Sequence, residues 1–182
     1  MMYGKQQISQ RTDDPASASR PFDADRDGVC YGEGSGVFVI ETQESAKVRG
    51  AKIYARVLGC GQSYEDRRFD KPATGDGYRR AIAKALETAK IQPSDVGHVN
   101  AHGESTTHGD ACEAQAIRDV LGDVPVTAIK SYFGNLGAGS GAVELAASLL
   151  ALESGELAPT LNYETPDPNC PINVVHGKPQ KI

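Results

Sequence analysis

The chain has 182 residues and a formal net charge of −5, which is long enough for one domain with a sizeable core. No basic stripe is visible, so nucleic acid is not an expected partner, because phosphate binding needs clustered Lys and Arg. The apolar stretch from Leu145 to Leu152 is too short to span a bilayer, and the polar N-terminus lacks the apolar core of a secretory signal. We therefore expect a cytoplasmic protein with no membrane span.

The start of the chain, residues 1–27, mixes charge, Ser and Pro without periodicity and predicts an extended N-terminal arm. The arm ends in RPFDADRDG (residues 20–28), which groups three carboxylates with two arginines. We interpret this segment as a solvated turn with local ion pairs. Residues 28–182 are then expected to form the domain itself.

Two apolar segments in the first third of the chain predict strands. Alternating glycines between residues 32 and 36 lead into the continuous apolar run Val37–Ile40, which is typical of a buried strand whose approach passes close to a bulky neighbour. A short helix is expected over Gln43–Arg49, ended by Gly50, and a β-branched strand over Ile53–Gly61.

Helices and strands alternate through the rest of the chain, which favours an α/β fold with a mostly parallel sheet covered on both faces. We expect helix 78–90, strand 96–101, a helix ending at Gly122, strand 125–129, and a last helix that starts after the glycine run 134–141. Asp110 and Glu113 resemble a capping box that opens the second of these helices. The last helix is apolar nearly all round, so it should be buried.

Reactive side chains follow two of these strands, where sites gather in parallel sheets. His102 lies in VNAHGESTTHGD (residues 99–110), and Lys130 and Asn135 lie in AIKSYFGNLGAGSGAVEL (residues 128–145). A neutral imidazole can donate to an oxyanion or act as general acid or base, whereas an amide can only donate. We therefore expect an oxyanion-polarising pair, with Lys130 either orienting His102 or pairing with Glu113.

Other interpretations of these loops are weaker. A lone histidine after a strand is more often structural than catalytic, and that alternative stays open for His102. A metal site is disfavoured because the strand and turn separate its candidate ligands, which are His98, His102, His108 and Asp110. The Rossmann-like match Gly137–Ala142 lacks the acidic strand end that should follow, and Ser35 and Ser140 do not lie in G-x-S-x-G. The four cysteines, Cys30, Cys60, Cys112 and Cys170, are widely spaced, which indicates reduced structural thiols.

Several segments together resemble the β-ketoacyl-acyl-carrier-protein synthases of the thiolase superfamily, in the branch that elongates fatty acyl chains. The matching segments include GEGSGVFVIE, VNAHGESTTHGDACEAQAI and GAVELAASLLALESGELAPTLNYETPDPNC, and the resemblance covers nearly the whole chain. It implies a thiolase-like α/β fold of two stacked βαβαβαββ halves. This chain resembles the last strand of the first half and most of the second half without its last strands, so residues 28–182 would be a partial C-terminal ketosynthase domain.

The resemblance also implies roles for individual residues. Family members use a cysteine nucleophile, two histidines and a lysine to transfer an acyl group, decarboxylate a malonyl unit and form a carbon–carbon bond. His102 and Lys130 match the family's histidine and lysine, and Asp110 and Glu113 match its acidic supporting network. Thr106 matches a threonine that contacts phosphopantetheine. Substrates would arrive on acyl carrier protein, and no metal or further cofactor is implied.

Four departures separate this chain from the family pattern. Asn135 stands where the second histidine is expected, although other branches of the superfamily use a Cys-His-Asn set. Glu104 replaces a phosphopantetheine-contacting threonine and would repel a phosphate or crowd the tunnel. Arg68 and Asp70 replace a histidine and a threonine. The half that carries the nucleophilic cysteine and the glycine-rich strand near the family's C-terminus have no match.

We therefore expect the C-terminal part of a 3-oxoacyl-acyl-carrier-protein synthase-like acyltransferase of fatty acid or polyketide synthesis, inactive by itself because the nucleophile is absent. Its partners would be acyl carrier protein and the missing N-terminal half. The alternative is a non-catalytic, chain-length-factor-like partner of an active ketosynthase subunit. A truncated sheet also leaves an unpaired edge, which predicts self-association and makes a homo-oligomer possible.

Overall fold

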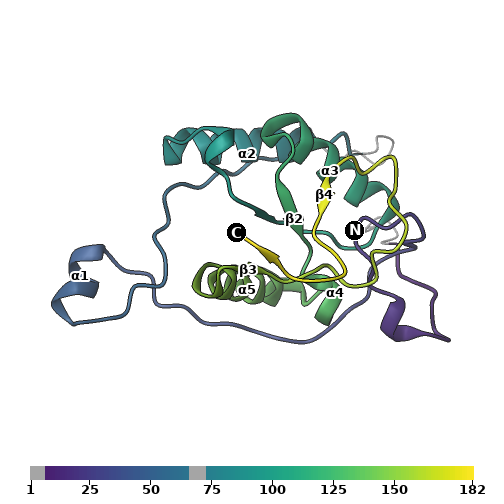
Figure 1. The fold of residues 1–182 in the computed structure, drawn as a ribbon, viewed down its shortest axis with the longest axis horizontal. Coiled ribbons are helices and arrows are strands. Elements are labelled where there is room, and N and C mark those ends of the chain that lie inside the picture. The colour runs from purple at the N-terminus through teal and green to yellow at the C-terminus, as the bar shows by residue number, and fades with distance from the viewer. Residues whose placement is uncertain (1–6, 66–72) are drawn as a thin grey trace.

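The computed structural model describes residues 7–65 and 73–182 (Figure 1). The longer helices are α2, α3 and α5, and the strands are short. The described elements are the 3₁₀ turns Pro15–Ser17, Pro93–Asp95 and Gly137–Gly139, the helices α1 (Gln43–Val48), α2 (Asp76–Ala89), α3 (Thr107–Leu121), α4 (Lys130–Phe133) and α5 (Ser140–Ser154), and the strands β1 (Val99–Asn100), β2 (Pro125–Thr127), β3 (Glu156–Leu157), β4 (Asn173–Val174) and β5 (Gln180–Lys181).

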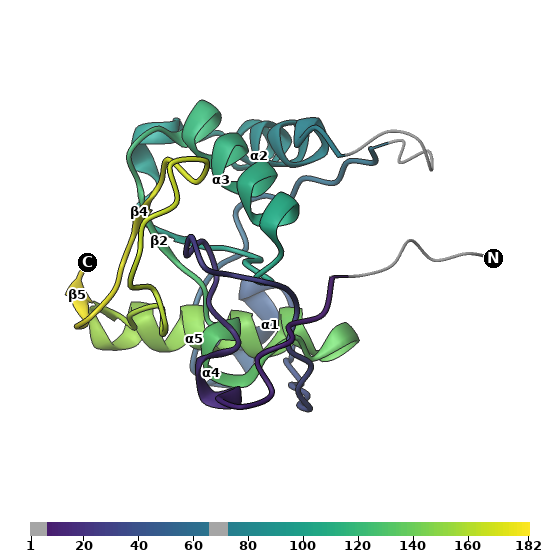
Figure 2. The same cartoon turned by 90° about the vertical axis from the view of Figure 1, so that its right-hand side faces the viewer.

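A three-stranded parallel sheet lies at the centre, in the order β1-β2-β4. Val99 of β1 lies opposite Val126 of β2, and Pro125 of β2 lies opposite Asn173 of β4. Helices α2 and α3 cover one face of this sheet and α5 lies on the other (Figures 1 and 2). The antiparallel pair β3-β5 forms a second small sheet beside α5. These layers confirm the predicted α/β class with a parallel sheet.

The main core fills the space between α3 and the sheet. It is built from small and β-branched side chains, together with one large residue, Phe22, which is fully buried. Phe22 comes from the N-terminal arm and holds a left-handed backbone conformation at φ 64°. The buried members of this cluster are Phe22, Ala101, Ala114, Ile117, Val124, Val126, Ala128, Cys170 and Val174.

The segment 20–28 is not the solvated turn that its charge pattern predicts. Arg20, Asp23 and Arg26 are all buried, and the local ion pair between Arg20 Nε and Asp23 Oδ1 spans 2.9 Å. Asp23 Oδ2 also accepts hydrogen bonds from the backbone N–H groups of Glu164 and Thr165, both at 2.7 Å. Buried charges are tolerated here because each has several partners. The proposed division of the chain at residue 27 stays a prediction.

The prediction of two strands in the first third of the chain is wrong. Residues 37–40 and 53–61 have no strand assignment, and Val37 and Ile40 are 94% and 81% exposed. These segments run out to α1 and back again, and α1 stands apart from the layered body (Figure 1). Among the described residues no strand lies beside them to complete a ladder, so apolar composition alone does not make them sheet.

The expected close approach before residue 37 is confirmed. A Cβ added at Gly32 would lie 1.8 Å from the carbonyl oxygen of Phe133, and one at Gly139 would lie 2.1 Å from the carbonyl oxygen of Gly34. The glycines therefore let segment 30–36 pass directly against the turn that precedes α5. Of the glycines in the Rossmann-like spacing of that turn, this packing explains Gly139, whereas a Cβ added at Gly137 or Gly141 would meet nothing within 4 Å.

The helices are mostly where the pattern predicts them, with two corrections. Helix α3 begins at Thr107, so Asp110 and Glu113 lie inside it rather than forming a capping box at its start. Helix α5 is not buried all round, because only its sheet-facing side is covered, and Leu150 is 64% exposed. None of the helices in the described part of the chain has the length and apolar character needed to cross a bilayer.

Candidate active site

The site is built on the loop from His102 to Thr106, which connects β1 to α3. This loop turns sharply, with Gly103 at φ 40° and Ser105 at φ 70°. A non-glycine residue in the left-handed region is strained and persists only where its surroundings hold it. Ser105 is held in this way, because it is fully buried and its Oγ accepts a hydrogen bond from the backbone N–H of Arg20 at 2.6 Å.

Two carboxylates on α3 hold the loop by its backbone. Glu113 accepts from the N–H of His102 at 2.7 Å and from the N–H of Gly103 at 2.8 Å. Asp110 accepts from the N–H of Glu104 at 3.1 Å and from the N–H of Phe22 at 2.9 Å. The two predicted support residues, Glu113 and Asp110, therefore fix the backbone from which the His102 side chain projects. Asp110 also connects the loop to the N-terminal arm through Phe22.

Both support carboxylates are buried, and burial disfavours their charged forms. Burial raises the pKa of Asp110 to about 7, although the hydrogen bond from Phe22 acts in the opposite direction. Burial also raises the pKa of Glu113, against the two hydrogen bonds that it accepts from the loop. Arg26 lies beside Asp110, with its Nε 3.7 Å from Oδ2, and it donates to the carbonyl oxygens of Thr106 and Thr107.

Lys130 lies at the start of α4 and is 1% exposed. Its Nζ donates to the carbonyl oxygen of His102 at 2.8 Å, lies 3.1 Å from His102 Nδ1, and forms an ion pair with Glu144 of α5. An ammonium group has no lone pair, so Nδ1 must accept and the ring proton of a neutral imidazole resides on Nε2. The expected partners of Lys130 were His102 and Glu113, and the structure favours His102. The carboxylate that pairs with the Lys130 ammonium belongs to Glu144 and not to Glu113.

Asn135 has its side chain oriented by its own loop. Its Oδ1 accepts from the N–H of Gly137 at 2.9 Å and from Ser140 Oγ at 3.2 Å. With the oxygen occupied by two donors, Nδ2 faces the site as a donor. The backbone of Asn135 is held from the other side, because its N–H donates to the carbonyl oxygen of Cys30 at 2.7 Å and its own carbonyl accepts from Gly32 at 3.0 Å.

His102 Nε2–H and Asn135 Nδ2–H converge on one oxygen. Glu104 Oε2 lies 3.3 Å from His102 Nε2 and 3.4 Å from Asn135 Nδ2. The hydrogen bond to Glu104 raises the pKa of His102 above its ordinary value, against the opposing effects of burial and of the Lys130 ammonium. The imidazole is partly exposed, so a substrate can approach it. Two donors aimed at one oxygen are the arrangement that stabilises a developing oxyanion.

The remaining predicted residues fall outside this convergence. Thr106 is buried at the start of α3, and a Cβ added at Gly109 would lie 2.4 Å from its Oγ1, so its side chain packs under the helix. Its role towards phosphopantetheine stays a prediction. Arg68 and Asp70 lie outside the described residues. Glu144 and Arg26 were not among the expected site residues, because their contacts with Lys130 and with the His102 loop depend on tertiary packing.

The thiols do not supply a nucleophile beside His102. None of the four cysteines, all of which lie in the described part of the chain, forms a disulfide. Burial raises the pKa of Cys30, whose backbone adjoins Asn135, and raises the pKa of Cys170 to about 12. Both shifts disfavour the reactive thiolate. In the described part of the chain, His, Cys, Asp and Glu side chains form no group of three or more that could hold a metal ion.

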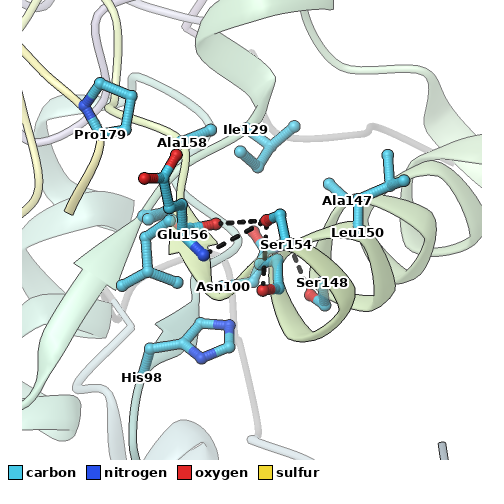
Figure 3. Close-up of a pocket in the computed structure, with 13 residues that line it drawn as sticks. His98, Asn100, Ile129, Ala147, Ser148, Leu150, Ser154, Glu156, Ala158 and Pro179 are labelled. Atoms are coloured by element: carbon cyan, nitrogen blue, oxygen red, sulfur yellow. Dashed lines mark hydrogen bonds between the residues drawn. The ribbon is translucent and has the colours of Figure 1, made fainter. Parts of the chain in front are cut away.

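A cavity of about 290 Å³ lies on the opposite face of the sheet from α3, between β1, β2 and α5 (Figure 3). Asn100 points into this region and donates to the carbonyl oxygen of Glu144 at 2.8 Å and to Ser148 Oγ at 3.0 Å. Its Oδ1 is buried and has no hydrogen-bond partner in the part of the chain that the structure describes. His102, Lys130 and Asn135 do not line this cavity, so it is separate from the two-donor site.

Comparison with known proteins identifies similar sequences over almost the whole chain. The sequence model described as beta-ketoacyl synthase, C-terminal domain, matches residues 54–164, and the one for the N-terminal domain matches residues 1–46. The chain is 42% identical over 180 residues to 3-oxoacyl-[acyl-carrier-protein] synthase 2 of Synechocystis sp., covering 96% of this chain but 43% of the relative. The chain thus spans less than half the length of this curated relative.

Solved structures show the same similarity. The ishigamide ketosynthase/chain length factor is 39% identical with a TM-score of 0.85, over 90% of this chain and 41% of that one. A type II polyketide synthase ketosynthase, in complex with its acyl-carrier protein and bound to the hexaketide, is 36% identical with a TM-score of 0.89, over 97% of this chain and 45% of that one.

Proposed function

The chain belongs to the β-ketoacyl synthase family, with its thiolase-like α/β fold, and from this premise we propose that it supplies the decarboxylating half of a condensing active site. The observation that carries the proposal is the convergence of His102 Nε2–H and Asn135 Nδ2–H on a single oxygen position. In this proposal, that position belongs to the thioester carbonyl oxygen of a malonyl unit carried by acyl carrier protein.

The chemistry follows from the two donors. When the bond between the malonyl carboxylate and the α-carbon breaks, carbon dioxide leaves and the electron pair moves through the α-carbon onto the thioester oxygen. The resulting enolate oxygen accepts both hydrogen bonds, which are stronger to an oxyanion than to the ground-state carbonyl. The carbonyl then re-forms as the α-carbon attacks an acyl thioester held by the cysteine of the complementary half, and the cysteine leaves as a thiolate.

Lys130 and the α3 carboxylates support this chemistry without touching the reacting atoms. Lys130 fixes the Nε2–H tautomer of His102 through its contact with Nδ1, and an imidazole in the other tautomer would present a lone pair to the enolate. Glu113 holds the His102 backbone, which limits how far the ring can move. Positioning of this kind matters because the donors must already be aligned when charge develops.

The test uses the protein that carries this chain, assayed for release of carbon dioxide from a malonyl thioester. We expect His102→Ala and Asn135→Ala each to lower kcat about 10²- to 10³-fold, the usual loss for one oxyanion donor. The matched control is His108→Ala, because His108 is an exposed histidine on the adjacent helix α3. Decarboxylation by His102→Ala within twofold of the unaltered protein would refute the proposal.

A second candidate function is a non-catalytic partner that shapes the pocket of an active ketosynthase. The similarity to a ketosynthase/chain length factor favours it, as do the departures at Glu104 and Asn135 from the family pattern. The two candidates differ in the complementary half. A cysteine in the nucleophile position of that half supports the enzyme, whereas another residue there supports the partner.

A further inference from the structure

The two donors of the site already share an acceptor from the chain itself. Glu104 Oε2 is the oxygen on which His102 Nε2–H and Asn135 Nδ2–H converge, at 3.3 Å and 3.4 Å. The position of Glu104 is set by the loop, because its backbone N–H donates to Asp110 and the next residue, Ser105, is locked in a left-handed conformation. The carboxylate is therefore directed into the site by the fold.

We propose that Glu104 is a specificity-determining residue whose carboxylate acts as an internal ligand of the two-donor site, so that a substrate carbonyl must displace it. The inference rests on the proposed function, in which the same two donors bind a thioester oxygen. In this proposal, Glu104 occupies the two donors when no substrate is bound. The donors become available when the Glu104 side chain swings away.

The geometry indicates that this internal ligand can be displaced. Hydrogen bonds to a carboxylate are usually 2.7 to 2.9 Å long, and both distances to Glu104 Oε2 are longer. The Glu104 side chain is 24% exposed, so water can solvate the carboxylate once it leaves. A buried carboxylate held by short bonds, like that of Glu113, would have no such exit.

The charges around the site determine what can replace the internal ligand. Glu113 and Asp110 of α3 and Glu144 of α5 bring three further carboxyl groups, whereas Lys130 and Arg26 are the cations placed beside them. After displacement, the Glu104 carboxylate stays near the two donors, because its backbone belongs to the same loop as His102. It therefore repels a second anion. The group that fits between the two donors is therefore a neutral carbonyl oxygen, such as that of a thioester, in preference to a carboxylate oxygen.

The experiment replaces Glu104 and offers the site a free carboxylate in its place. In the protein that carries this chain, we expect Glu104→Ala to lower the pKa of His102, measured by NMR titration of the histidine ring. Added formate should raise that pKa again in Glu104→Ala and leave it unchanged in the unaltered protein. His108 supplies an internal reference signal, and Glu87→Ala is the matched control because Glu87 is an exposed glutamate on α2.

Two further measurements make the outcome decisive. If Glu104→Ala does not fold, Glu104→Gln keeps the size of the side chain and should lower the pKa of His102 by removing the charge. With a malonyl thioester, Glu104→Ala should lower KM roughly two- to fivefold, the effect of losing a competitor held by a partly exposed ion pair. Formate binding equally well with and without Glu104, or a His102 pKa unchanged in both variants, overturns the proposal.

This design separates the proposal from the proposed function. Should His102→Ala leave decarboxylation intact, the role of His102 as an oxyanion donor fails. The formate titration of Glu104→Ala would still report whether Glu104 occupies the two donors, since it measures binding and requires no turnover.

Discussion

Replacing Lys130 by Met tests the electrostatic arrangement around His102 most directly. Met has a similar length and fills the space of the Lys side chain, so the change removes the charge and the donors with little change in packing. Lys130 is almost fully buried, and the Nζ atom that would be lost contacts Glu144, the His102 carbonyl oxygen and His102 Nδ1. The substitution therefore leaves Glu144 as an uncompensated carboxylate and leaves Nδ1 without its donor.

The magnitude follows from burial. Removing one member of a buried ion pair costs about 3 to 5 kcal/mol, because the charge that is left has lost its water and its partner. The Glu144 side chain is 17% exposed, which lets water recover a small part of that cost, so we expect the lower end of the range. The double variant Lys130→Met with Glu144→Gln removes both charges and should recover at least half of the lost stability.

The assay is urea unfolding of the two variants and the unaltered protein, together with NMR titration of His102. Because the ammonium disfavours an imidazolium at 3.1 Å, its loss should raise the pKa of His102. Two results would refute the reasoning. One is a double variant that is less stable than Lys130→Met, and the other is a His102 pKa that falls when Lys130 is removed.

Two further predictions concern the arm and the buried acids. Phe22→Ala should lower the unfolding free energy by about 3 to 5 kcal/mol because Phe22 is fully buried. Val57→Ala, at an exposed site, is the control and should change it by less than about 0.5 kcal/mol. Similar losses in the two variants would contradict the placement of Phe22 in the core. Asp110 keeps its proton in the folded state up to a pKa of about 7, but releases it near 3.8 when unfolded, so ionisation favours unfolding. The unfolding free energy of the unaltered protein relative to Asp110→Asn should therefore fall between about pH 4 and pH 7, by at most about 4 kcal/mol, and a rise would contradict the sign.

The location of the candidate site could be predicted from local pattern. His102, Lys130 and Asn135 follow two strands that turned out to be neighbours in a parallel sheet, so topology alone placed them at one edge. The tautomer of His102 could not be predicted, because it depends on the distance from Nδ1 to Lys130. Glu144 was missed for a similar reason, since its contact with Lys130 depends on how α5 packs below the sheet.

The errors in the fold share one physical cause. The run Val37–Ile40 has strand composition, but a strand needs a neighbour to pair with, and composition contains no information about that neighbour. For the charged segment 20–28 the prediction was exposure to solvent, whereas the structure buries three of its charged side chains. Arg20, Asp23 and Arg26 are buried because they have partners, which include residues 164 to 167, and the contacts with these residues span most of the chain.

The ion pair of Arg26 with Asp167 has a consequence for the nascent chain. Arg26 Nη1 and Asp167 Oδ2 lie 2.6 Å apart in space but 141 residues apart in sequence. At about 5 to 20 residues per second, the ribosome adds the aspartate roughly 7 to 28 seconds after the arginine. The same guanidinium also donates to Thr106 and Thr107, so during that interval the arginine that anchors the His102 loop lacks one of its partners. The complete anchorage of the site therefore waits for Asp167, although its histidine is synthesised earlier.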